Sequence, residues 1–123
     1  LGLGPLLLSE VEDRRGGGMA AEGALLRRAL PVGAFRVVLD ERGRQMASPA
    51  LAQMIARIRD EGRQDMAFVI GGADGLDPVF RADADAALSF GAMVWPHMLV
   101  RVMLAEQLYR AATILAGSPY HRD

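Results

Sequence analysis

The sequence of 123 residues contains no cysteine, no lysine and only 6% aromatic residues. Without cysteine the chain can form neither a disulfide framework nor a thiolate metal site, and it has no cysteine nucleophile. Its two histidines, His97 and His121, are far apart in the chain and make a poor set of metal ligands, so we expect no metal. There is no run of about twenty apolar residues and no signal-peptide pattern, so we expect no membrane span and a cytoplasmic location.

The positive charge comes from arginine alone and is unevenly distributed. Residues 14–59 hold nine arginines against three acidic residues, whereas residues 60–85 hold two arginines against seven acidic residues. Segregated charge of this kind steers a polyanion to one face, although two ordinary solvated surfaces would give the same distribution. The apolar fraction of 51% is high for one small domain, because such a domain buries only about two-thirds of its unfolded surface. The surplus indicates a further interface, most simply that of a dimer.

Hydrophobic patterning predicts one α/β domain over residues 1–123. Continuous apolar runs at 35–39 and 66–70 are typical of buried parallel strands. Ser48 and Asp77 each precede a proline and are expected to cap helices, while Gly62 and Gly117 are expected to end them. The other expected elements are a short strand from 6–8 to Val11, helices at 19–30, 48–62, 77–88 and 97–116, a polar loop at 40–47 and a glycine-rich loop at 71–76. This alternation predicts a mostly parallel sheet with helices on both faces.

Two loops are candidate ligand sites. Residues 70–75 (IGGADG) follow a predicted strand, at the edge where ligands bind in open α/β sheets. Their glycine spacing is not that of a dinucleotide-binding loop, and no Lys-Ser/Thr of a phosphate-binding loop follows. A plain tight turn is an equally good interpretation. Residues 90–95 are apolar, with an aromatic residue at each end, and either hold a flat ring or belong to the core.

The last helix and the tail after it hold further candidates. At 100° per residue, Arg101 shares an apolar stripe with Leu108 and Ala112. It therefore faces an anionic ligand or a subunit interface, or else forms a structural ion pair or extends to solvent. The polar side chains of the helix are expected on the opposite side: Glu106, Gln107, Arg110 and Thr113. In the tail, residues 120–122 (YHR) suit stacking on a base and contacting a phosphate, although terminal residues are often frayed.

Several segments together resemble one family, the ribosomal RNA large subunit methyltransferase H family of SPOUT methyltransferases. They are FVIGGADGL at 68–76, ALSF at 87–90, WPH at 95–97, LVRV at 99–102, AEQLYRA at 105–111 and PYHR at 119–122. The resemblance runs from about residue 35 to the end, and residues 1–34 match only loosely. The family begins with a further strand and helix, so we expect this sheet to lack a strand.

The resemblance implies a deep trefoil knot in the C-terminal part, with the knot and cofactor region at 66–117. It also implies a homodimer whose active site lies near the subunit junction, and S-adenosylmethionine as the cofactor. The implied cofactor-binding residues are Leu39, Gly71, Gly72, Phe90, Gly91, Ala92, Met93, Val94 and Trp95.

The implied reaction is methylation of N3 of a pseudouridine in 23S ribosomal RNA of the assembled ribosome. The implied catalytic residues are Arg101, Glu106, Tyr109 and His121, and the implied RNA-binding residues are Arg110, Tyr120 and Arg122. Because N3 carries a proton that must leave, His121 or Glu106 is expected to handle it, and Arg101 to stabilise the developing negative charge. Two alternatives are a SPOUT methyltransferase of another RNA and a non-catalytic RNA- or ribosome-binding module. A small-molecule-binding α/β domain is disfavoured by the tail.

Overall fold

The computed structural model describes residues 18–71, 77–91, 93 and 95–121, which contain a three-stranded sheet. The strand order is β2-β1-β3, and β1 pairs in parallel with both neighbours. The expected α/β fold with a parallel sheet and flanking helices is thus confirmed. The strands are β1 (Phe35–Gln45), β2 (Met66–Ile70) and β3 (Ala86–Ser89), and the helices are α1 (Gly18–Ala29), α2 (Ser48–Asp60), α3 (Pro78–Ala82) and α4 (His97–Leu115).

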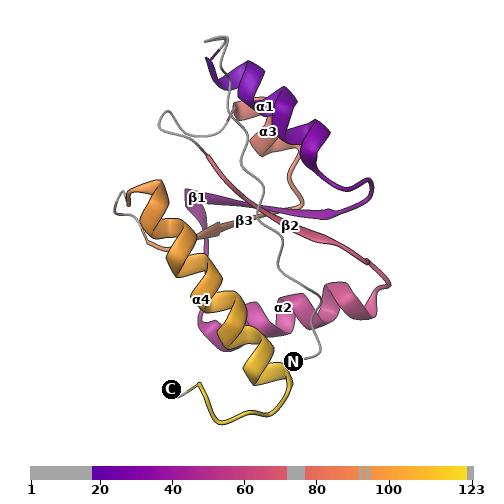
Figure 1. Ribbon diagram of the computed structural model, residues 1–123, viewed down its shortest axis with the longest axis vertical. Helices are drawn as coiled ribbons and strands as arrows, with labels where there is room; N and C mark the ends of the chain where they lie inside the picture. Colours follow the sequence, from indigo (N-terminus) through magenta and orange to yellow (C-terminus); the bar gives the residue numbers. More distant parts are fainter. Residues whose placement is uncertain (1–17, 72–76, 92, 94, 122–123) are drawn as a thin grey trace.

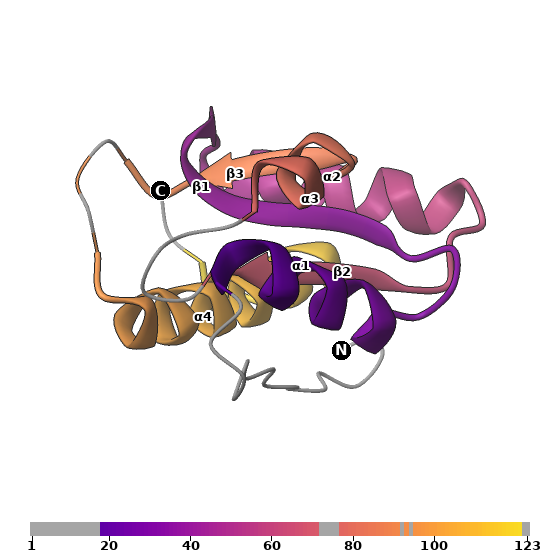
Figure 2. The same cartoon turned by 90° about the horizontal axis from the view of Figure 1, so that it is seen from above.

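Helices cover both faces of the sheet, α1 and α3 on one and α2 and α4 on the other (Figures 1 and 2). Because successive side chains of a strand point to opposite faces, neighbouring valines of β1 enter different cores. Val37 packs among residues of α2 and α4, including Ile55 and Ala111. Val38 packs against Phe80 of α3 on the other face.

The patterns with clear periodicity predict their elements well. The helix expected at 19–30 is α1, the strand at 66–70 is β2, and the helix at 97–116 is α4. Helix α2 ends as predicted just before Gly62, whose φ of 87° is a left-handed conformation that glycine adopts without strain. The strand expected near residues 6–11 lies outside the described residues.

The prediction of a polar loop at 40–47 is wrong, because β1 continues to Gln45. The strand bends after Leu39, and its pairing with β3 shifts register between Leu39 and Arg44. Gly43 lies so close to β3 that an added Cβ would be 2.7 Å from the Ala87 carbonyl carbon. The segment is polar because most of it is exposed, yet it still pairs with the sheet.

The prediction of one helix over 77–88 is also wrong. Asp77 does precede a helix, but α3 ends after five residues, and Ala86–Ser89 forms the third strand. Pairing of Ala86, Ala87 and Leu88 with β1 overrides the helix propensity of the alanines. Ser48 does not cap α2, since Ala47 holds that position, and the Ser48 hydroxyl donates instead to Gln107 Oε1 at 2.7 Å.

None of the helices in the described part of the chain is both long and apolar enough to cross a membrane. Among the same residues there is no group of three or more His, Cys, Asp or Glu side chains that could hold a metal ion.

Candidate active site

The carboxyl ends of β2 and β3 lie beside the point at which β1 bends. Leu39 of β1 lies in register with Ile70 of β2 and with Leu88 of β3. Gly71 directly follows Ile70, and Phe90 follows the end of β3. Leu39 and Phe90 also contact the core cluster beneath this edge. The structure thus brings the candidate residues of two separate loops to one place, which we call the strand-end edge.

The loop that leads from this edge to α4 carries the other candidate cofactor residues. Gly91 adopts a φ of 117°, while Met93 is 71% exposed and Trp95 is 38% exposed. The interpretation of this loop as pure core is therefore wrong for Met93 and Trp95. Gly72, Ala92 and Val94 lie outside the described residues.

Polar residues that the sequence patterns did not indicate hold the strand-end edge. The Asp40 carboxylate, only 10% exposed, accepts hydrogen bonds from the Arg42 main-chain N–H at 3.0 Å and from Arg81 Nη1 at 3.2 Å. The buried Ser89 hydroxyl lies within 3.1 Å of the carbonyl oxygens of Glu41 and Gly91. The position of Asp40 in the sequence could have indicated its role, because this polar residue directly follows the apolar run of a predicted buried strand.

A second cluster forms where the tail folds back on α4. Glu106 Oε1 accepts hydrogen bonds from Arg110 Nη2 at 2.6 Å, from Arg110 Nε at 3.0 Å and from the Tyr120 hydroxyl at 3.2 Å. The Arg110 guanidinium also lies 4.9 Å from the centre of the Tyr120 ring, and Tyr109 packs edge-on against that ring at 5.0 Å. His121 Nδ1 is 3.1 Å from Arg110 Nη1. We call Glu106, Tyr109, Arg110, Tyr120 and His121 the tail cluster.

The contacts within the tail cluster set the state of Glu106. Its hydrogen bonds from Arg110 hold the pKa of the Glu106 carboxyl below its ordinary value of about 4.5, with a further contribution from Tyr120 and against a smaller opposing effect of burial. The same pairing raises the pKa of Arg110. The second carboxylate oxygen, Oε2, accepts from Gln107 Nε2 at 3.1 Å. Glu106 is therefore an ionised acceptor with a donor on each oxygen.

His121 contacts Arg110 through one nitrogen of its ring. A guanidinium can only donate hydrogen bonds, so the contact with Arg110 makes Nδ1 of His121 the acceptor. The last residue of the motif, Arg122, lies outside the described residues.

The expected apolar stripe and polar side of α4 are only partly correct. Arg101 is half-buried, and its Nη1 lies 3.5 Å from Met98 Sδ. Thr113 is not on a solvated side, since it is 1% exposed and its hydroxyl donates to the Arg110 carbonyl at 2.7 Å. The outward face of α4 is instead apolar, with exposed fractions between 42% and 65% for Met98, Leu99, Val102 and Tyr109.

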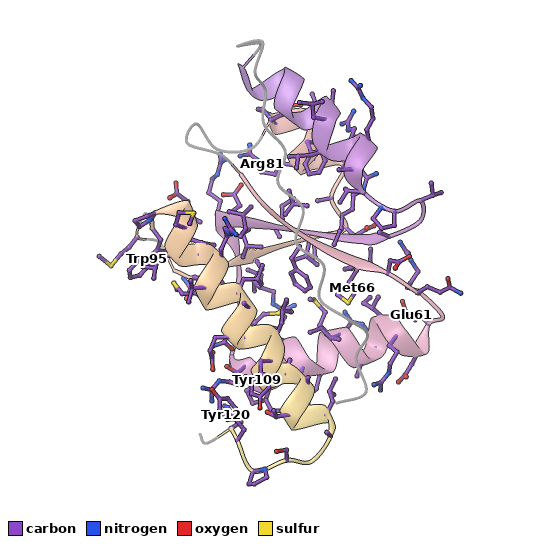
Figure 3. The ribbon with its side chains drawn as sticks, in the orientation of Figure 1. Glu61, Met66, Arg81, Trp95, Tyr109 and Tyr120 are labelled. Atoms are coloured by element: carbon purple, nitrogen blue, oxygen red, sulfur yellow. The ribbon has the colours of Figure 1, made fainter. Side chains whose placement is uncertain are left out.

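The strand-end edge and the tail cluster lie at opposite ends of α4. Figure 3 shows Trp95 beside the start of this helix, while Tyr109 and Tyr120 gather near its other end. At about 1.5 Å per residue, the first residue of α4 and Tyr109 are separated by roughly 18 Å along the helix axis. Within one chain the described candidate residues therefore form two separate groups.

Comparison with known proteins shows the family to which the chain belongs. A family model described as predicted SPOUT methyltransferase matches residues 8–121. The chain is 70% identical to a ribosomal RNA large subunit methyltransferase H of Ruegeria pomeroyi, over 99% of this chain and 78% of that protein. It is 70% identical to the protein of that name from Roseobacter denitrificans and 69% identical to that from Paracoccus denitrificans, in each case over 100% of this chain and 79% of the relative. Identity of this extent places the chain in the ribosomal RNA large subunit methyltransferase H family of SPOUT methyltransferases.

Proposed function

We propose that this protein transfers a methyl group from S-adenosylmethionine to N3 of a pseudouridine in 23S ribosomal RNA of the assembled large subunit. The relatives' names support the substrate class, and a family membership of this kind implies the methyl donor. The observation that carries the proposal is the pair of built clusters at the two ends of α4, one suited to a cofactor and one to a nucleotide.

The residues of the strand-end edge fit S-adenosylmethionine. Leu39 and Phe90 supply apolar surface, and Gly71 and Gly91 allow a close approach to main-chain groups. Trp95 adds a partly exposed aromatic face nearby. We assign cofactor binding to this edge, including Gly72, Ala92, Met93 and Val94. When bound, the cofactor supplies an activated methyl group on a sulfonium, so the protein's main task is to align N3 with it.

The tail cluster suits the base and its proton. Transfer of the methyl group from the sulfonium to N3 would displace the N3 proton, which would pass to the protein or to solvent. Glu106 is a poor acceptor for that proton, because both of its oxygens are occupied and its pKa is lowered. We assign the uptake of that proton to His121, whose Nδ1 contacts Arg110 and must first be released by it. We assign the stabilisation of developing negative charge to Arg101, and contacts with RNA to Tyr109, Arg110, Tyr120 and Arg122.

A homodimer would complete the site. The outward face of α4 is apolar over Met98, Leu99, Val102 and Tyr109, which is an unusual surface for a monomer. Two copies packed about a twofold axis with their α4 helices antiparallel would place the tail cluster of one subunit beside the strand-end edge of the other. We further infer the family's trefoil knot within residues 66–117 of a single domain, and a cytoplasmic location where ribosomes assemble.

Mixed dimers test the function and the shared site together. Gly71→Val should abolish binding of S-adenosylmethionine in calorimetry, and His121→Ala should abolish methyl transfer to ribosomes while leaving that binding intact. When the two inactive variants are co-expressed with different tags, half of the dimers are mixed and each mixed dimer keeps one intact site of two. About a quarter of the wild-type activity should therefore return.

Each of the opposite results contradicts a different part of the proposal. No recovery in mixed dimers would place each site within one subunit. Unchanged methyl transfer by His121→Ala would remove His121 as the proton acceptor. A wild-type protein that binds ribosomes but never S-adenosylmethionine would be a non-catalytic binding module.

A further inference from the structure

Ser89 occupies an unusual position at the end of β3. It is 5% exposed, and it is one of two buried polar side chains in the described part of the chain. Its hydroxyl oxygen accepts a hydrogen bond from the Gly91 main-chain N–H at 3.0 Å. The hydroxyl group is also within donating distance of two carbonyl oxygens, that of Gly91 at 3.0 Å and that of Glu41 at 3.1 Å. One hydroxyl thus contacts both the loop that follows it and a segment 48 residues earlier in the chain.

The segment that Ser89 reaches on β1 is itself held rigidly. Asp40 accepts from the Arg42 main-chain N–H and from the guanidinium of Arg81, which approaches from α3. Figure 3 shows Arg81 above the sheet, on the side away from α4. Gly43 then brings the bend into van der Waals contact with the main chain of Ala87. Contacts other than that with Ser89 therefore also hold the segment that carries the Glu41 carbonyl.

The segment that Ser89 reaches on its other side is the start of the loop at 90–95. Gly91 adopts a left-handed φ of 117°, and its N–H and C=O both lie within hydrogen-bond distance of the same serine oxygen. A serine that binds main-chain groups two residues ahead stabilises such a turn locally. The conformation with which this loop leaves the sheet thus depends on one side chain.

We propose that Ser89 is a positioning residue for the methyl donor, because it locks the loop at 90–95 to the bend of β1 at the strand-end edge. This inference rests on the proposed cofactor site. Ser89 touches neither cofactor nor substrate in this assignment. It acts by keeping the two walls of the site, Leu39 on β1 and Phe90–Gly91 after β3, in one fixed relation.

The expected size of the effect follows from the hydrogen bonds that Ser89→Ala removes. If they keep the loop in its binding-competent conformation, their loss lowers the population of that conformation, and the apparent affinity falls by the same factor. One or two hydrogen bonds to main-chain groups correspond to about a three- to tenfold change. We therefore expect Kd and KM for S-adenosylmethionine to rise about three- to tenfold, with kcat nearly unchanged.

Thr113→Val provides a matched control. Thr113 is also buried, and its hydroxyl also donates to a main-chain carbonyl, but it lies near the far end of α4. Its loss should lower the stability to a similar extent without changing the affinity for S-adenosylmethionine. Ser89→Cys keeps a donor group on a larger atom that forms weaker hydrogen bonds, so its Kd should fall between those of the wild type and Ser89→Ala. Amide exchange at Gly91 should accelerate in Ser89→Ala and remain slow in Thr113→Val.

The experiment is calorimetric titration of S-adenosylmethionine into the full chain, with Gly71→Val included, followed by methyl-transfer kinetics on ribosomes. A rise in Kd and KM for Ser89→Ala but not for Thr113→Val supports the proposal. An unchanged Kd for Ser89→Ala, an equal rise for Thr113→Val, or full recovery in Ser89→Cys overturns it and leaves the cofactor site standing. If the wild type does not bind, or if Gly71→Val binds normally, the assigned site is wrong and the role of Ser89 is refuted with it.

Discussion

Replacement of Gly43 by alanine tests the close contact between the bend of β1 and β3. An added Cβ would lie 2.7 Å from the Ala87 carbonyl carbon and 2.9 Å from both the Ala87 oxygen and the Leu88 carbonyl carbon. All three neighbours are main-chain atoms of a paired strand, so none of them can rotate away. Ordinary contacts begin at about 3.4 Å. The bend must therefore move outward by several tenths of an ångström, away from the Ser89 hydroxyl.

The cost has two parts. Overpacking in a well-packed region costs about 1–3 kcal/mol, and loss of the Ser89 contact to Glu41 adds about 1 kcal/mol. We therefore expect Gly43→Ala to lower the free energy of unfolding by about 2–4 kcal/mol. Because the bend forms one wall of the strand-end edge, the affinity for S-adenosylmethionine should fall as well.

Gly62→Ala is the appropriate control, because Gly62 requires glycine for its backbone conformation, whereas Gly43 requires it for lack of space. Gly62 has a φ of 87° and no atom within 4 Å of its added Cβ, and it lies before β2, at the opposite edge of the sheet. Its substitution should cost about 1–2 kcal/mol through backbone strain alone and leave cofactor affinity unchanged. The measurements are urea unfolding followed by circular dichroism, and calorimetry. A Gly43→Ala protein within about 0.5 kcal/mol of the wild type would refute the steric argument.

Three further predictions concern the core, the α4 face and the tail cluster. Phe80→Ala, which empties a fully buried position between α3 and the sheet, should destabilise the protein by about 3–5 kcal/mol in urea unfolding. Val102→Arg should convert the proposed dimer to a folded monomer in sedimentation experiments, since this side chain is 65% exposed on the apolar face of α4. The lowered pKa of Glu106 means that its pairing with Arg110 stabilises the fold above pH 4.5 and is lost as the pH falls through the lowered value. The difference in unfolding free energy between wild type and Glu106→Gln should accordingly vanish in acid, and its persistence there would contradict the assignment.

The sequence patterns predicted correctly those elements whose structure follows from their own residues and not from a partner strand. Helix α2 follows from regularly spaced apolar residues and strand β2 from a continuous apolar run, and their bounds agree with the structure. The predictions failed where the structure of a segment depends on its pairing with another strand. Ala86 and Ala87 favour a helix locally and become a strand because β1 offers them hydrogen bonds. The segment from Asp40 to Gln45 looks like a loop because its exposed residues are polar, and only contact with β3 makes it a strand.

The same distinction applies to the candidate site. The glycine after β2 could be placed at the ligand edge of the sheet from its position behind a buried run. The hydrogen bond between the Ser89 side chain and the Glu41 carbonyl could not be predicted, because it crosses a bend that the sequence patterns did not indicate. The tail is an intermediate case. Its composition indicated a nucleotide-binding role, but its return to Glu106, fourteen residues earlier in the chain, depends on three-dimensional packing.

The separation of the two clusters along α4 has a consequence for how mutations act. Ser89 and Gly43 belong to the strand-end edge, whereas Glu106 fixes Tyr120 and Arg110 at the other end of the helix. Changes in the first group should therefore alter cofactor affinity with little effect on the binding of ribosomes, and changes in the second should do the reverse. Because α4 also carries the apolar face, a substitution that separates the subunits should lower methyl transfer even when both clusters are intact. Activity then depends on protein concentration, whereas in a site confined to one subunit it would not.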